Sequence, residues 1–254
     1  MSESIVTRYY NDYWAVSEGW TPHPSLSPLK RKILTRWITR QSSVLDVGCG
    51  DGAHYGRLLA TIAHAYYGLD VSQVAVDVAR QSGILARQHD LGNAFPFPDE
   101  MFDSVICLEV LEHLFDPAFT LREICRVLKP NGCAILSVPN IAHFSNRARL
   151  LFGRFAPGGT PETSSRRPWA DPHIRFFTLN AWRAFIAEQG LQIVALHGES
   201  FSLFSTIPLW SSFAARWVKW ERLEQWSQPF EFMARLLPSL CAGHFLAIVT
   251  RRVV

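Results

Sequence analysis

The chain is 254 residues long, 48% of its residues are hydrophobic, and its formal net charge is +3. This length suits one well-buried domain with elaborations, and so small a charge does not indicate a nucleic-acid partner. The five cysteines show no paired spacing, which predicts buried thiols in a reducing compartment and argues against disulfides or a zinc site.

The start of the chain is polar, without a signal peptide, and no apolar run reaches 18 residues. We therefore expect a cytoplasmic protein. An aromatic segment follows at residues 9–14, with Trp20 after it. This segment can fold over a ligand as a lid, and its candidate contacts to an acceptor are Tyr10, Tyr13 and Trp14.

Helices and strands are predicted to alternate from residue 27 onward. The predicted strands cover residues 44–47, 65–70, 85–88, 104–108, 133–138, 192–196 and 244–250. The predicted helices cover residues 27–40, 52–59, 72–79, 116–128 and 178–190, and four of them begin at a Ser, Thr or Asp cap. The proline-rich residues 95–98 form a connector. This order predicts a doubly wound, mostly parallel α/β sheet with helices on both faces.

The stretch V-L-D-V-G-C-G-D-G at residues 44–52 has the clearest functional pattern. An apolar run ends at Asp46, and glycines then occupy every second position. The pattern predicts a buried strand that enters a tight turn of bare backbone, against which a ligand can lie. A second strand ends at Asp70, the position at which nucleotide-type βαβ units bind ribose hydroxyls.

The glycine spacing indicates which nucleotide binds. Dinucleotide sites use G-x-G-x-x-G, whereas this chain has G-x-G-x-G with an acid on each side of the first two glycines. Two carboxylates repel a pyrophosphate but suit a ligand that carries an amino group and a ribose. The spacing disfavours an NAD-dependent reductase, and no Gly-Lys-Ser/Thr phosphate loop is present. Here the chain resembles the class I S-adenosylmethionine-dependent methyltransferases, whose first motif is similar to residues 45–52.

The resemblance implies a Rossmann-like, seven-stranded sheet whose last strand runs antiparallel between the fifth and sixth strands. It also implies S-adenosylmethionine as cofactor, and we expect no metal. Asp46 would lie near the amino group of the cofactor, Asp70 would accept the ribose hydroxyls, and Asp90 would hold the adenine unless it only caps a turn. The full set of implied cofactor-binding residues is Asp46, Gly48, Cys49, Gly50, Asp70, Val71, Asp90, Leu91, Leu108 and Glu109.

Two histidines are candidates for the general base. Residues 109–113 read E-V-L-E-H and resemble the E-V-x-E-H stretch of methyltransferases related to ubiquinone-pathway and methionine-regulon enzymes. His113 in this stretch suits proton acceptance near neutral pH, although it can also serve only to pack at a helix start. His173 lies just before a helix cap, in a segment similar to the methionine-biosynthesis subgroup, and its alternative role is to anchor the loop.

A basic segment separates the two halves of the chain. Seven arginines lie between residues 141 and 183 against two acids. So long an irregular segment is typical of a substrate loop, and its charge favours an anionic acceptor, for which Arg166, Arg167 and Arg175 are the candidate contacts. A solvated basic surface is the alternative.

The predicted organisation is one methyltransferase domain with four parts. These are an N-terminal helical lid at 1–40, a cofactor-binding core at 41–138, a substrate loop at 139–177, and a C-terminal half at 178–254 with a helical insert at 201–240. The insert contains several tryptophans. An ordinary helix packed on the core is preferred for it over an acceptor-pocket wall, a dimer interface or a membrane contact.

The sequence therefore predicts an enzyme that methylates a small molecule at oxygen, as a monomer or homodimer, without nucleic acid. N-methylation remains open, because a neutral amine can react without a base. A non-catalytic cofactor-binding or regulatory protein also remains open, although the paired Glu112 and His113 favour catalysis.

Overall fold

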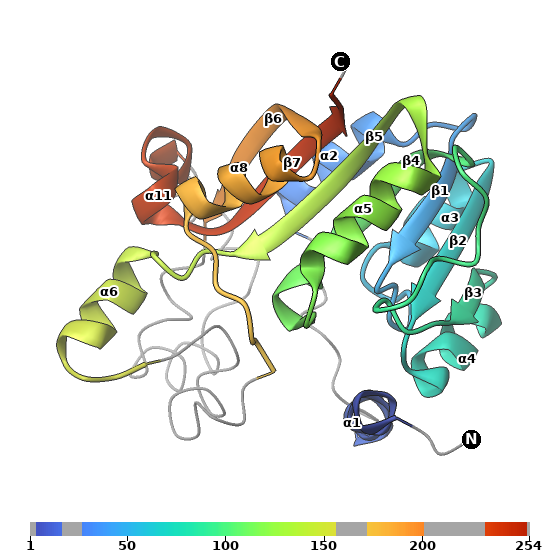
Figure 1. Cartoon of the computed structure of the whole chain (residues 1–254), viewed down its shortest axis with the longest axis horizontal. Coiled ribbons are helices and arrows are strands. Elements are labelled where there is room, and N and C mark those ends of the chain that lie inside the picture. The colour runs from blue at the N-terminus through green and yellow to red at the C-terminus, as the bar shows by residue number, and fades with distance from the viewer. Residues whose placement is uncertain (1–3, 17–26, 156–171, 201–231, 253–254) are drawn as a thin grey trace, which may run out of the picture.

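The computed structural model describes residues 4–16, 27–155, 172–200 and 232–252. Its centre is a seven-stranded sheet with the strand order β3-β2-β1-β4-β5-β7-β6 (Figure 1). The strands are β1 (Ser43–Val47), β2 (Ala65–Asp70), β3 (Leu85–Gln88), β4 (Phe102–Leu108), β5 (Leu128–Pro139), β6 (Leu191–Ser200) and β7 (Ala242–Arg251). β7 pairs antiparallel with both β5 and β6, whereas the pairs among β1 to β5 are parallel. The predicted topology is confirmed, including the place of the last strand.

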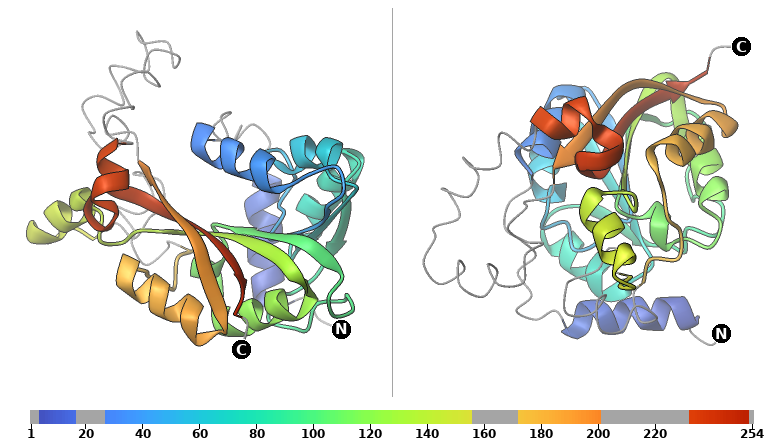
Figure 2. Two further views of the ribbon diagram at one scale, coloured as in Figure 1. Left: turned by 90° about the horizontal axis from the view of Figure 1, so that it is seen from above. Right: turned by 90° about the vertical axis from the view of Figure 1, so that its left-hand side faces the viewer.

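Helices cover both faces of the sheet, and each face has its own apolar core. α2 (Pro28–Trp37), α3 (Gly56–Ile62) and α4 (Gln73–Gln81) lie on one side, while α5 (Pro117–Val127) and α8 (Leu179–Glu188) lie on the other (Figure 2). Leu34 and Val76 are fully enclosed on the first side, and Leu121 and Trp182 on the second. Because both faces are buried, most residues of the central strands β1 and β4 are apolar.

The helix starts follow the predicted caps. The side chains of Ser27, Ser72, Asp116 and Thr178 each accept a hydrogen bond from the backbone N–H three residues ahead. Each satisfies a donor that the first helical turn cannot satisfy itself. These caps fix where α2, α4, α5 and α8 begin.

Several predicted bounds differ from the structure, and one helix was not predicted. α3 begins at Gly56 instead of Gly52, because Gly52 has φ +73° and the Asp51 carboxylate accepts the Ala53 N–H in a tight turn. β5 begins at Leu128, so the predicted helix end and the strand are continuous. The segment predicted as irregular contains α6 (Phe144–Leu151), whose N-cap is His143.

Two further elements are short. η1 (Leu111–His113) follows β4, and α11 (Pro238–Cys241) precedes β7. Most of the predicted insert 201–240 lies outside the described residues, as do Trp20, Arg166 and Arg167. Within the described ranges, no helix combines the length and the hydropathy needed to cross a bilayer.

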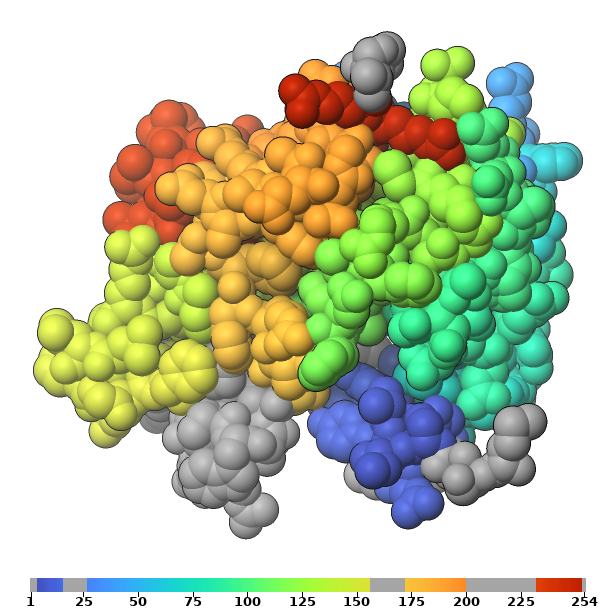
Figure 3. Space-filling view, in the orientation of Figure 1, coloured from blue at the N-terminus to red at the C-terminus, as the bar shows by residue number. Residues whose placement is uncertain are grey.

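The N-terminal helix α1 (Ile5–Val16) lies beyond the carboxyl ends of β1 and β2, and the space-filling view shows it along the lower edge of the molecule (Figure 3). It contacts α4. The Ser72 hydroxyl donates to Asn11 Oδ1 at 2.8 Å. Because open α/β sheets bind ligands at the carboxyl edge, α1 covers the edge at which a ligand is expected.

Candidate active site

The turn after β1, residues 48–52, is here called the glycine turn. Gly48, Gly50 and Gly52 have φ values of +78°, +54° and +73°, a region that residues with a β-carbon rarely adopt. The N–H groups of Gly48 and Cys49 both donate to the Leu69 carbonyl. The turn is thus held against the end of β2, and its glycines are required by backbone conformation.

Neighbouring side chains approach the glycine turn closely. A β-carbon on Gly48 would lie 2.4 Å from Val110 Cγ2, and one on Gly50 would lie 2.8 Å from Trp14 Cζ2. The indole of Trp14 therefore rests on bare backbone at Gly50. The predicted lid segment reaches the predicted cofactor turn, and the cradle there exists only because no β-carbon fills it.

Asp70 organises this turn from the end of β2. Its two carboxylate oxygens accept the N–H groups of Gly50 and Ser72, each at 2.9 Å. Burial raises the pKa of the Asp70 carboxyl, and these backbone hydrogen bonds partly oppose the rise. A carboxylate offers about four lone-pair positions, so Asp70 retains capacity to accept two further hydroxyl groups.

Asp46 is fully enclosed beneath the turn. Its Oδ2 accepts the Tyr66 hydroxyl at 2.7 Å, while Oδ1 has no hydrogen-bond partner among the described residues. Burial, assisted by the nearby Asp70, raises the pKa of Asp46 to about 7 against the effect of the Tyr66 bond. A buried acceptor without a partner needs a donor, and a ligand amino group would supply one.

The other predicted cofactor residues have varied environments. Cys49 is buried, with its thiol against Gly68 and donating to the Gly50 carbonyl at 3.5 Å. Leu91 and Leu108 are buried, and the Val71 carbonyl accepts the Gln88 side-chain amide. Asp90 is exposed and accepts the Gly92 N–H at 2.9 Å, which is the turn-cap geometry given above as its alternative role.

The end of β4 brings an acid and two histidines together. Glu112 is 1% exposed, and both of its carboxylate oxygens lack a hydrogen-bond partner within the described part of the chain. Nε2 of His113 and Nε2 of His173 each lie 3.8 Å from Glu112 Oε1. The two imidazoles stack with their centroids 4.6 Å apart. The structure thus unites both predicted base candidates, which we call the histidine pair.

Backbone contacts hold the histidine pair in place. The Glu112 carbonyl accepts the N–H groups of Ile174 and Arg175, and His113 Nδ1 lies 3.2 Å from the Pro172 carbonyl. Tyr10 of α1 meets His113 edge to face at 6.4 Å. The predicted lid, the strand end and the predicted substrate loop therefore meet at one point beside the carboxyl end of β4.

This group can do two kinds of chemistry. Burial, with a further contribution from Glu109, raises the pKa of Glu112 well above its usual range and so favours its protonated form. With two adjacent imidazoles it can accept and pass on protons. The ligand atoms of Glu112, His113 and His173 also lie within 4.8 Å of one another, a set that can bind a divalent ion.

The arginines predicted to contact the acceptor are only partly described. Arg175 lies beside the histidine pair and places its guanidinium 5.4 Å from the ring centre of Phe115. Arg147, Arg149 and Arg154 lie in or just after α6, a helix in which no residue is buried. Tyr13 is 45% exposed at the outer side of α1.

Sequence reasoning missed several residues at this edge. Asn11 docks α1 onto α4, and Tyr66 holds Asp46. Lys30, Glu199 and His244 form an ion-pair group with Glu109. The sequence offered one signal, because Glu199 and His244 lie at the carboxyl-edge ends of the last two apolar strands. Their partner on α2, Lys30, is distant in sequence, so the sequence did not show that these residues meet.

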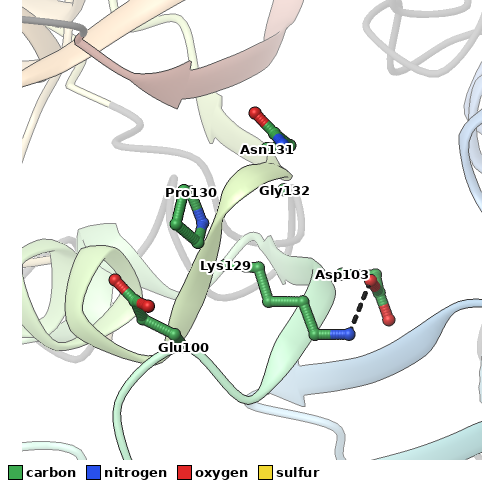
Figure 4. Close-up of a pocket in the computed structure, with 6 residues that line it drawn as sticks. All are labelled: Glu100, Asp103, Lys129, Pro130, Asn131 and Gly132. Atoms are coloured by element: carbon green, nitrogen blue, oxygen red, sulfur yellow. Dashed lines mark hydrogen bonds and ion pairs between the residues drawn. The ribbon is translucent and has the colours of Figure 1, made fainter.

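A shallow hollow of about 370 Å³ lies at the opposite, amino-terminal edge of the sheet, where Lys129 forms an ion pair with Asp103 at 2.7 Å (Figure 4). It does not adjoin the glycine turn or the histidine pair. Its ion pair is a useful reference for charge changes made far from the site.

Comparisons relate this geometry to known proteins. Residues 45–136 match the family described as a methyltransferase domain. A ubiquinone biosynthesis O-methyltransferase of Aromatoleum aromaticum is 27% identical over 207 residues, covering 75% of this chain and 81% of that protein. One from Pseudomonas paraeruginosa is 32% identical over 140 residues, covering 50% of this chain and 58% of that protein. A putative methyltransferase structure from Bacillus halodurans has a TM-score of 0.59 at 20% identity, covering 89% of this chain and 100% of that one, which shows the shared fold.

Proposed function

Since the chain belongs to the class I S-adenosylmethionine-dependent methyltransferases, we propose that it methylates a hydroxyl oxygen of a small, anionic or polar molecule. The relatives are named as O-methyltransferases, which supports oxygen as the methylated atom. A cytoplasmic location, a monomeric or dimeric state and the absence of a nucleic-acid partner stay predictions.

The residues present fit the cofactor. When bound, S-adenosylmethionine supplies an already activated methyl group, so the protein's work is binding and alignment. The unpartnered Oδ1 of Asp46 would accept from its amino group, and Asp70 would accept from its ribose hydroxyls. The bare backbone at Gly48 and Gly50 would carry its amino-acid tail. Trp14 on Gly50 marks where α1 would close this cradle.

The histidine pair supports the choice of oxygen, and its place over the buried Glu112 is the observation that carries the proposal. A hydroxyl must lose its proton as the new carbon–oxygen bond forms. His113 would take this proton, and Glu112 with His173 would orient the imidazole and stabilise the charge. Tyr10 and Arg175 approach the same place from the lid and the substrate loop, where they would hold the acceptor.

Two alternatives remain testable. An amine acceptor would need alignment but no base, so the histidine pair would then be structural. A cofactor-binding protein without catalysis would need the glycine turn alone. The buried acid with two imidazoles at the ligand edge of the sheet favours an enzyme over both.

Binding provides the first test. S-adenosylhomocysteine should raise the melting temperature of the protein by mass action, whereas NAD and ATP should not. Asp70→Ala should weaken this binding by about 1.5–3 kcal/mol, the range for hydrogen bonds to a charged group. A shift with NAD and none with S-adenosylhomocysteine would contradict the proposed cofactor.

Transfer to matched acceptors provides the second test. A panel of small hydroxy acids and the corresponding amino acids would be incubated with the protein and S-adenosylmethionine carrying a labelled methyl group. Label transferred to hydroxylated members alone supports oxygen methylation. Transfer to amines alone supports the nitrogen alternative, and cofactor binding without any transfer to a broad panel supports the non-catalytic one.

A further inference from the structure

An ion-pair group of four residues lies at the carboxyl edge of the sheet, beside the glycine turn. We call Lys30, Glu109, Glu199 and His244 the ionic cluster. Lys30 Nζ lies 3.3 Å from Glu109 Oε1 and 3.1 Å from Glu199 Oε2. His244 Nε2 lies 3.3 Å from Glu109 Oε2, and its Nδ1 lies 3.8 Å from Glu199 Oε2. Two carboxylates therefore share one lysine and one imidazole.

The cluster joins elements that are distant along the chain. Lys30 is on α2, Glu109 follows β4, Glu199 is near the end of β6, and His244 is near the start of β7. Glu199 and His244 are register partners in the antiparallel pair. Ser137 of β5 completes the row by donating its hydroxyl to Glu109 Oε1 at 2.5 Å. One helix and four adjacent strands are thus tied together where the ligand is expected (Figure 1).

Glu109 has the unusual backbone in this group. Its φ is +56°, a conformation that a residue with a β-carbon adopts only when its surroundings enforce it. Its N–H donates to the Ser137 carbonyl at 3.2 Å, so both its backbone and its side chain are held. The left-handed turn at the end of β4 is therefore maintained by contacts to Glu109.

This turn meets the glycine turn directly. Val110, the next residue, lies on Gly48 so closely that a β-carbon there would be 2.4 Å from Val110 Cγ2. Any change in the Glu109 conformation would move Val110 relative to Gly48. The ionic cluster is thus linked to the glycine turn through the peptide unit between Glu109 and Val110.

Charge balance holds the cluster together. The side chain of Lys30 is 14% exposed and that of Glu199 is 11% exposed. Although burial opposes its charge, the two carboxylates raise the pKa of Lys30 above its ordinary value. Burial would raise the pKa of Glu109, but His244 and Lys30 hold it down to about 2. Removal of the lysine would leave the buried Glu199 and the partly exposed Glu109 facing one imidazole, and an uncompensated charge in such a place is destabilising.

We propose that Lys30, Glu199 and His244 are positioning residues for cofactor binding, which act by holding Glu109 and hence the turn after β4 against the glycine turn. Their charge balance matters, and none of them needs to touch the ligand. The inference rests on the proposed cofactor. Failure of the unaltered protein to bind S-adenosylhomocysteine would overturn the proposed function, whereas normal binding by all variants would overturn this inference alone.

The test is a charge-rescue experiment on the full chain, with S-adenosylhomocysteine affinity measured by calorimetry. Lys30→Met should weaken binding at least about tenfold, because the two carboxylates repel each other once the lysine is gone. Adding Glu199→Gln to this variant removes one of the two negative charges and leaves Glu109 with His244. The double variant should bind within about threefold of the unaltered protein, a difference below 0.7 kcal/mol.

The rescue separates positioning from direct contact. If Lys30 held the ligand itself, Glu199→Gln would restore nothing, and that result would overturn the proposal, as would unchanged binding by Lys30→Met. Lys129→Met is the matched control, because it breaks the ion pair with Asp103 at the opposite edge and should leave affinity unchanged. If Lys30→Met does not fold, the double variant still decides, because weak binding by a folded double variant contradicts charge balance.

Discussion

The glycine turn and the histidine pair lie at the same edge of one sheet but are built in different ways. The glycine turn and Asp70 come from one continuous stretch, residues 44–70, and are joined by backbone hydrogen bonds. The two histidines are 60 positions apart and meet through a loop that returns to the end of β4. The comparison teaches that the proposed cofactor side, the glycine turn with Asp70, depends on local backbone conformation, whereas the proposed acceptor side, the histidine pair, depends on long-range assembly.

The largest effect is expected from Gly48→Ala, which tests the backbone basis of the cofactor side. A β-carbon there combines left-handed strain with a collision against Val110, together about 2–5 kcal/mol. We expect cofactor affinity, measured by calorimetry with S-adenosylhomocysteine, to fall between about thirtyfold and several thousandfold, the factors that correspond to about 2 and 5 kcal/mol.

Gly190→Ala is the matched control for this change. Gly190 has a similar φ of +74°, but no described atom lies within 4 Å of an added β-carbon. It should lower the free energy of unfolding by about 1–2 kcal/mol and leave cofactor affinity unchanged. Equal losses of affinity in both variants would mean that general destabilisation, not the shape of the glycine turn, weakens binding.

The next effect tests the acceptor side. His113→Ala should reduce turnover of a hydroxylated acceptor at least about a hundredfold, the lower end for a positioned base, while S-adenosylhomocysteine affinity stays nearly intact. His113→Asn should not restore turnover, because an amide lacks basicity. Lost cofactor binding would show that His113 is structural, and near-normal turnover would transfer the base to His173 or indicate an amine acceptor.

A chelator distinguishes the two chemistries open to the histidine pair. If Glu112 and the histidines only transfer protons, dialysis against a chelator should leave turnover unchanged, as the prediction of no metal requires. Loss of turnover that a divalent ion restores would instead show that these side chains are ligands. With either outcome the chelator should not change S-adenosylhomocysteine binding, because that binding depends on the cofactor side.

What the sequence predicted follows the same division. The four helix caps and the glycine turn were predictable because each depends on a few neighbouring residues, whereas the place of the last strand was implied by the family resemblance. The start of α3 was missed because Gly52 extends the turn instead of opening the helix. His113 and His173 were each named, but the buried Glu112 between them and the ionic cluster required the three-dimensional arrangement.

A smaller effect concerns pH and the cofactor side. The pKa of Asp46 is raised to about 7 in the folded protein, so the folded state retains a proton that the unfolded chain releases near pH 4. The stability that Asp46 contributes is therefore full below about pH 4 and is lost as pH rises through about 7. The free energy of unfolding, measured with urea at about pH 4 and about pH 7, should therefore fall less in Asp46→Asn, by about 1–3 kcal/mol. An identical decline in both proteins would contradict the buried, protonated Asp46.

The smallest effect is expected at Arg175, where the acceptor side reaches solvent. Its guanidinium lies over Phe115 and donates to the Phe115 carbonyl, so it is already oriented beside the histidine pair. Exposed charges contribute only about 0.5–1 kcal/mol, so Arg175→Ala should raise the KM of a carboxylated acceptor about two- to fivefold. The KM of the same acceptor without its carboxylate should not change, and added salt should reduce the difference.

Arg122→Ala is the control, because Arg122 also stacks on a phenylalanine, Phe119, but lies on α5. Equal changes in KM for the two acceptors would mean that Arg175 belongs to a solvated basic surface and that other residues bind the acceptor's charge.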